Sequence, residues 1–217
     1  MSKSTCLLTN AEIEGFFQAL MKEYPNPKSE LDYTNEYTLL VAVALSAQAT
    51  DIGVNKATKS LFRIVKTPQD MLDLGEEALK THIRTIGLFN TKAQNIMKTA
   101  KILVADFNGI VPQTRKELES LPGVGRKTAN VVLNVAFGQP TIAVDTHLFR
   151  VGNRVGIAVG KTPLQVELGY ENVIPEQYIQ DAHHYLILHG RYCCKAQKPN
   201  CQICPVNKYC KYDNKLL

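Results

Sequence analysis

The segment LPGVGRK, Leu121–Lys127, joins two helical patterns, one ending at Ser120 and the next starting at Arg126. Its two glycines permit positive φ and a close approach of the backbone, and the first turn of the second helix has N–H groups without helical partners. Such a turn can bind an anion, for example one nucleic-acid phosphate, without reading base sequence. The same residues also fit a plain helix–helix turn. A P-loop is disfavoured because the turn lacks the spacing of that motif.

Apolar residues recur at helical spacing along nearly the whole chain, strand-like alternation is absent, and Gly, Pro and Asn separate the patterns. The segments Tyr37–Ser46 and Thr128–Phe137 are apolar on most faces, as buried central helices are. The predicted helices cover residues 11–24, 36–46, 51–64, 67–73, 76–86, 90–107, 114–120, 126–137, 146–155, 163–173 and 177–190. Short connections between so many helices predict an all-α fold, and Gly138-Gln139-Pro140 predicts a second lobe beginning near Pro140.

The composition fits a globular chain of 217 residues with 45% apolar residues and a net charge of +5. Residues 191–217 hold six basic residues and one acid, which is the whole excess, and a basic terminus is attracted to phosphate backbones. Thr9-Asn10-Ala11-Glu12 predicts a capping box rather than a signal peptide, and no apolar run is long enough to span a membrane. We therefore expect a soluble, cytoplasmic protein with no membrane partner.

Five of the six cysteines follow residue 192, and four of them have the spacing C-x6-C-x2-C-x5-C: Cys194, Cys201, Cys204 and Cys210. Disulfides are not expected in an intracellular protein, so a metal site is the default interpretation. Four cysteines can hold zinc or a [4Fe–4S] cluster, and spacing alone leaves both open. Cys193 is outside the pattern but adjacent to it, and Cys6 fits a plain apolar residue.

Lys127 is expected in the first turn of its helix. A lysine amine is a nucleophile only when it is neutral, and its usual pKa of about 10.4 leaves little neutral form at pH 7. The positive end of the helix, partial burial and the adjacent Arg126 would each lower that pKa. A phosphate-binding lysine without chemistry is the alternative on position alone.

Asp145, in Val144-Asp145-Thr146-His147, precedes a helical pattern, and Asp is among the best N-cap residues. A capping carboxylate is held rigidly, so a structural and a chemical role are compatible. His147 is more typical of a packing or hydrogen-bonding residue, and we leave it outside the catalytic set. His183 and His184 are interpreted as ordinary helix residues.

Four segments together resemble the helix-hairpin-helix DNA glycosylases, and specifically the endonuclease III family: LSAQATD (Leu45–Asp51), LPGVGRKTANVVLN (Leu121–Asn134), TIAVDTHLFRV (Thr141–Val151) and HGRYCC (His189–Cys194). Matching segments run from about residue 36 to 210, about four-fifths of the chain. The cysteine spacing equals the iron–sulfur signature of that family. The resemblance therefore implies a [4Fe–4S] cluster held by Cys194, Cys201, Cys204 and Cys210, which decides against zinc.

The resemblance implies a bifunctional DNA glycosylase/AP lyase of base excision repair. It would remove oxidised or ring-damaged pyrimidines through a Schiff base on Lys127, with Asp145 as the catalytic aspartate facing it across a groove, and cleave the strand by β-elimination. Its partner would be double-stranded DNA with damaged bases or abasic sites, so the protein would associate with the nucleoid, and a monomer is expected. The family's DNA-binding positions correspond to Gln48, Leu88, Gly123, Gly125 and Lys198. Leu88 fits a core residue equally well.

The expected architecture has two helical lobes flanking a DNA-binding cleft: a six-helix domain at 29–139 with the hairpin, and an iron–sulfur domain formed by 1–28 and 140–217. The nearest alternative is a monofunctional relative that excises mispaired bases without nicking. Lys127 argues against it, since those relatives typically lack this lysine. A non-catalytic DNA-binding module is a further alternative, but it leaves the co-occurrence of Lys127 and Asp145 unexplained.

Overall fold

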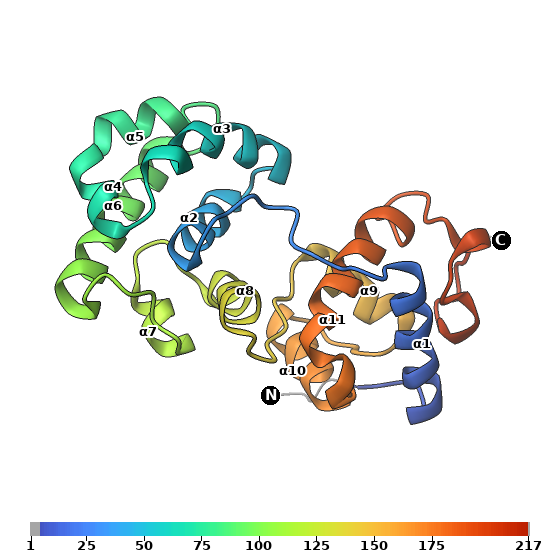
Figure 1. Cartoon of the computed structure of the whole chain (residues 1–217). Helices are drawn as coiled ribbons and strands as arrows, with labels where there is room; N and C mark the ends of the chain where they lie inside the picture. The colour runs from blue at the N-terminus through green and yellow to red at the C-terminus, as the bar shows by residue number, and fades with distance from the viewer. Residues whose placement is uncertain (1–4, 217) are drawn as a thin grey trace. The chain divides into compact units, whose positions relative to one another are not determined.

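The computed structural model describes residues 5–216. The chain divides into two compact units, and each is described by itself: a central unit, Ser29–Gln139, and a terminal unit, Met1–Lys28 with Pro140–Leu217. The fold is all-α, as predicted, since the described residues form helices and loops with a single isolated bridge between Thr5 and Val159 (Figure 1). Within that range, no helix combines the length and the apolar character needed to cross a membrane.

The central unit contains α2 to α8. Their bounds are Glu36–Ser46, Asp51–Ile64, Pro68–Leu74, Glu76–Ile83, Phe89–Phe107, Arg115–Ser120 and Arg126–Phe137. These seven helices correspond to the seven segments predicted between residues 36 and 137. The predicted six-helix domain therefore has one helix more than expected. Gly75, with φ of 80°, ends α4 and directly precedes α5, because glycine readily adopts a positive φ that interrupts the helical path. Helix α5 ends at Ile83 instead of continuing to residue 86 as predicted.

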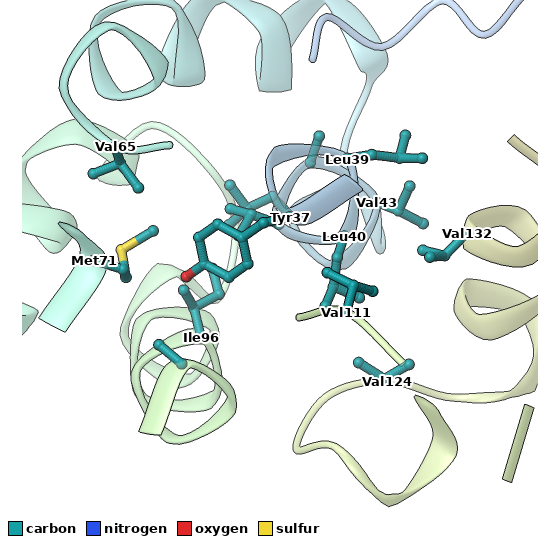
Figure 2. Close-up of a cluster of buried hydrophobic side chains, with 14 of the residues drawn as sticks. Tyr37, Leu39, Leu40, Val43, Val65, Met71, Ile96, Val111, Val124 and Val132 are labelled. Atoms are coloured by element: carbon teal, nitrogen blue, oxygen red, sulfur yellow. The ribbon is translucent and has the colours of Figure 1, made fainter. Parts of the chain in front are cut away.

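Helix α2 forms the middle of the central unit. Eight of its eleven residues are buried, which confirms the expectation drawn from its apolar faces. Figure 2 shows Tyr37 on the side of α2 toward Met71 and Val43 on the side toward Val132. Because a helix that is apolar all round must be covered on all sides, α3, α6 and α8 pack against it.

The terminal unit contains α1 and α9 to α11, followed by short turns. The α-helices are Asn10–Glu23, Thr146–Val155, Pro163–Val173 and Glu176–Leu188. The last ends two residues earlier than predicted, because the chain continues as a π-helix at His189–Cys193, where Cys194 N–H donates to the His189 carbonyl at 2.8 Å. Two 3₁₀ turns, Cys201–Ile203 and Asn207–Tyr209, complete the cysteine-rich end.

The predicted helix starts are confirmed where the sequence has side-chain caps. Thr9 and Glu12 form the capping box at α1, with the Thr9 N–H donating to Glu12 Oε2 at 2.7 Å. Thr67 and Thr162 cap α4 and α10, each followed by Pro at the first helical position. Local side-chain chemistry therefore sets these boundaries.

Gly15 gives a test of packing in the terminal unit. A Cβ atom at this position would lie 2.5 Å from Cζ of Tyr209, closer than real Cβ contacts allow. We predict that Gly15→Ala lowers the free energy of unfolding by about 1–3 kcal/mol. Gly87→Ala is the control, because a Cβ there meets no atom within 4 Å. Equal thermal melting of the two variants would contradict the assigned contact.

Candidate functional site

The hairpin between α7 and α8 is anchored by its apolar residues. Leu121 and Val124 are buried in the core of the central unit, while Gly123 and Gly125 are exposed. Thr99 Oγ1 on α6 donates to the Pro122 carbonyl at 3.1 Å. The turn is thus held from the core side, and its glycine backbone faces outward.

The two glycines of the hairpin differ in backbone conformation and in the space around them. Gly123 has φ of 79°, and a Cβ there would also lie 2.9 Å from Asn95 Nδ2. Gly125 has an ordinary φ of −95°, and a Cβ there would meet nothing within 4 Å, so only Gly123 uses the positive φ that glycine permits. Gly125 is the N-cap of α8 and has no side chain to accept from the first-turn amides. The start of α8 therefore has no side-chain cap to compete with an external anion.

Lys127 is the second residue of α8, in the first turn as predicted. Its side chain is exposed, so the partial burial expected from the sequence is wrong. The reason is its place at the start of the helix, because the buried residues of α8 begin at Ala129.

Asp145 caps α9 in the terminal unit. Its Oδ1 accepts from the N–H groups of His147 at 2.8 Å and Leu148 at 2.9 Å, which confirms the predicted cap. Both bonds use the same carboxylate oxygen, and the residue is only half-buried. His147 Nδ1 lies 3.1 Å from Arg150 Nη2, a hydrogen-bonding contact of the kind expected.

Gln48 and Leu88 share an unusual backbone conformation. Gln48 follows α2 with φ of 56°, and Leu88 precedes α6 with φ of 58°. Both side chains are exposed, and Leu88 has 66% of its surface in solvent, so the interpretation of Leu88 as a core residue is wrong. Left-handed backbone is unfavourable for a leucine, so the surrounding structure must hold this turn.

The cysteines predicted as ligands surround one small pocket in the terminal unit. Cys194, Cys201, Cys204 and Cys210 all line it, together with His189 and Cys193, and the four are half-buried. Four thiols converging on one protected pocket are the donor set that an iron–sulfur cluster requires. The residues present therefore fit such a group.

Cys193 lies next to Cys204 rather than apart from the site. The sulfur atoms of Cys193 and Cys204 and a ring nitrogen of His189 all lie within 4.8 Å of one another. A hydrogen bond from the Cys193 thiol lowers the pKa of Cys204, and His189, with Nε2 at 3.9 Å from the sulfur, lowers it further. Both contacts favour the thiolate, the form of cysteine that binds metal.

Two arginines of α9 hold the loop that starts at Cys194. Arg150 Nε donates to the Cys194 carbonyl at 2.9 Å, and Arg154 donates to the carbonyls of Lys195 at 2.6 Å and Ala196 at 2.9 Å. Lys198 in this loop is exposed and has φ of 48°. The loop therefore presents its lysine from a backbone that is tied to α9.

Sequence reasoning missed Arg150 and Arg154, although their spacing of four places them on one helix face. It also missed Asn95 and Thr99, which contact the hairpin from α6, and Lys92, whose ammonium binds the end of α2. These side chains bond to backbone atoms or pack against them, and such contacts leave no motif.

Two protein-family models match parts of the chain. Residues 41–176 match the HhH-GPD superfamily of base excision DNA repair proteins, and residues 194–210 match the iron–sulfur binding domain of endonuclease III. The first match covers more than half of the chain and includes the hairpin, Lys127 and Asp145. The second begins at Cys194 and ends at Cys210.

Individual proteins agree with these families. Endonuclease III of Rickettsia conorii is 58% identical over 200 residues, covering 92% of this chain and 95% of its own length. A solved structure of a trapped endonuclease III–DNA covalent intermediate, an estranged-adenine complex, has a TM-score of 0.88 and 46% identity, covering 94% of this chain and 97% of that one. A thermostable thymine-DNA glycosylase has a TM-score of 0.83 at 26% identity, covering 94% and 97%.

The fold and the site thus define a helix-hairpin-helix base excision repair protein. Within that class the chain belongs to the endonuclease III family. It is a DNA glycosylase with AP lyase activity, and its cofactor is a [4Fe–4S] cluster.

Adjacent cysteines allow a matched test of cluster binding. We predict that Cys194→Ser loses most of its iron and acid-labile sulfide, whereas Cys193→Ser keeps both, since only Cys194 has the ligand spacing. Iron and sulfide assays on each purified variant, with the visible absorbance of the cluster, give the measurement. Iron loss in Cys193→Ser with full loading of Cys194→Ser would reverse the ligand assignment.

Proposed function

We propose that Lys127 is the nucleophile of the glycosylase and lyase reactions. The observation that carries this proposal is its position: an exposed lysine in the first turn of a helix whose start has no side-chain cap, directly after a glycine hairpin. A phosphate held by the hairpin amides would bring the adjacent sugar close to this amine.

The neutral Lys127 amine attacks C1′ of the damaged nucleotide, forming an N–C bond while the glycosidic bond breaks and the base leaves with the bonding electrons. Loss of a proton from nitrogen and opening of the sugar ring give a protonated Schiff base, which acidifies the 2′ proton. Removal of that proton forms a C=C bond and expels the 3′ phosphate. Hydrolysis of the imine then restores the amine.

Asp145 is proposed to stabilise the positive charge that develops on the sugar and to help deprotonate the attacking amine. The cap supports this role, because two backbone N–H groups hold the carboxylate in a fixed orientation while occupying a single oxygen. Lys127 and Asp145 belong to different units.

Gln48 and Leu88 are proposed to fill the gap that a flipped nucleotide leaves in the duplex. Extruding a base costs a few kcal/mol, and side chains inserted into the stack offset that cost. An exposed leucine in left-handed backbone is unfavourable for folding, which supports a role in binding.

Cys194, Cys201, Cys204 and Cys210 are the proposed ligands of the cluster, which supplies a rigid structural link and no redox step to the repair reaction. The arginine contacts from α9 support a structural purpose for this loop. Because the loop is already held in place, Lys198 would bind a phosphate with little further loss of conformational entropy. Gly123 and Gly125 contribute the backbone approach at the hairpin.

We propose oxidised or ring-damaged pyrimidines and abasic sites in duplex DNA as substrates, with the protein acting as a monomer on cytoplasmic, nucleoid DNA. The trapped covalent intermediate between an endonuclease III and DNA supports a covalent step in a relative. An amine at position 127 fits the lyase activity, since a glycosylase without that activity needs no amine nucleophile.

Trapping with borohydride tests the nucleophile. Wild-type protein and duplex DNA with an abasic site or an oxidised pyrimidine should give a covalent adduct, and Lys127→Ala should reduce it at least about a hundredfold. Lys116→Ala, an exposed lysine of α7, is the control and should trap normally. A wild type without adduct on either substrate rules out the lyase mechanism, and full trapping by Lys127→Ala rules out this lysine.

Substitutions at Asp145 can separate its role as an N-cap from its proposed role in the reaction. Asn is as good an N-cap as Asp, so we predict that the free energy of unfolding of Asp145→Asn lies within about 0.5 kcal/mol of the wild-type value. Its kcat should fall about a hundredfold. Asp145→Ala should lose the cap as well, about 1 kcal/mol. Single-turnover glycosylase rates and thermal melts measure the two effects. Normal kcat in Asp145→Asn would leave Asp145 as a cap only.

A further inference from the structure

Lys92 contacts two turns that the proposed function assigns to DNA. It lies on α6, one turn after Leu88, and its backbone N–H donates to the Leu88 carbonyl at 3.0 Å. Its ammonium donates to the carbonyls of Leu45 at 2.9 Å and Ala47 at 2.7 Å, immediately before Gln48. One residue therefore ties the start of α6 to the end of α2.

The end of α2 needs such a contact. The last carbonyls of any helix have no helical partner, and they carry the negative end of the helix dipole. Helix α2 has no basic residue in its last turn, and its C-cap, Ala47, is no glycine in left-handed backbone. Lys92 supplies from another helix both the donors and the positive charge.

The surroundings of Lys92 hold the ammonium in place. The side chain is half-buried and lines a cavity of about 180 Å³ together with Ala47, Leu88 and the hairpin residues Pro122, Gly123 and Val124. Burial lowers the pKa of Lys92. A partly desolvated ammonium gains from each carbonyl contact, so moving it away from the α2 carbonyls is costly.

We propose that Lys92 is a positioning residue that fixes the Gln48 loop and, through the first turn of α6, the Leu88 turn in the backbone conformations needed to enter DNA. This inference rests on the proposed roles of Gln48 and Leu88. Both residues have positive φ, 56° for Gln48 and 58° for Leu88, and such backbone persists only where its surroundings determine it. Lys92 contacts both turns.

The competing explanation is that Lys92 binds a DNA phosphate directly. The two explanations differ in salt dependence, because a lost phosphate contact reduces the slope of log K against log salt by about one. Removal of a positioning contact leaves that slope unchanged. The carbonyls of Leu45 and Ala47 already occupy two of the three ammonium donors.

The experiment compares cluster-loaded wild type, Lys92→Met and Lys101→Met. Lys101 lies on the same helix and is exposed, so its substitution removes an equal charge without the α2 contact. The DNA is a duplex with a stable abasic analogue and a fluorescent base analogue opposite it, which reports insertion into the stack. We expect Lys92→Met to lower the insertion signal and the kcat/KM on damaged duplex about tenfold or more. Lys101→Met should stay within about twofold.

A double-mutant cycle with Gln48→Ala separates positioning from an independent effect. If Lys92 acts through the Gln48 loop, the double variant should lose little more than the larger single loss, whereas additive losses would overturn the proposal. A salt slope reduced by about one in Lys92→Met would also overturn it, in favour of a phosphate contact.

Two controls keep the outcome interpretable. Borohydride trapping on single-stranded abasic DNA, which needs no gap filling, should be within about twofold of wild type in Lys92→Met. Loss of trapping in the wild type itself would instead reject the proposed function. If Lys92→Met has a lower melting temperature or contains less iron than wild type, Lys92→Arg is measured in its place. The arginine keeps the charge and the donors, so most of the insertion signal should return. A folded Lys92→Arg protein without that signal would contradict the positioning role.

Discussion

Helix α2 is apolar on every face and must be enclosed, and much of the central unit follows from that requirement. Helices α3, α6 and α8 cover it, and the hairpin residues Leu121 and Val124 join the same core. A helix enclosed in this way still has polar ends. Its first turn is capped by Asn35, and at its other end the carbonyls of Leu45 and Ala47 accept from Lys92 of α6. The core of the fold and the surface turn at Gln48 are therefore parts of one arrangement.

Backbone strain in the described residues coincides with the positions assigned to DNA. Four residues other than glycine have positive φ: Gln48, Leu88, Asn108 and Lys198. Asn108 ends α6, a common place for this conformation. The other three are exposed side chains, and left-handed backbone costs about 1–2 kcal/mol for such residues. Folding alone gives no reason to retain that cost at three sites.

Local chemistry made much of the fold predictable. The caps at Thr9, Thr67 and Thr162 depend on residues within one helical turn, so the order of residues along the chain is enough to find them. Helix ends were harder, since α5 stops at Ile83 while its apolar pattern continues to Ile86, which is also buried. The π-helix at His189–Cys193 was missed as well.

The placement of candidate residues was predictable where local sequence sets it, as for Lys127 in the first turn of α8, the Asp145 cap and the cysteines around one pocket. It was not predictable where a side chain supports the backbone of another segment. Lys92 contacts carbonyls 47 and 45 positions away in sequence, and every residue has a carbonyl. The exposure of Lys127 and Leu88 likewise depends on how helices pack, so the sequence pattern was wrong for the first and left the second open.

The anchoring of the loop after Cys194 has a consequence for its charge. Arg150 and Arg154 bind main-chain carbonyls of Gly190, Cys194, Lys195 and Ala196, so these contacts do not depend on the side chains at positions 195–198. Mutations at the exposed positions 195–198 can add or remove charge while the loop stays in place. The charge of the loop can therefore vary independently of the contacts that shape it.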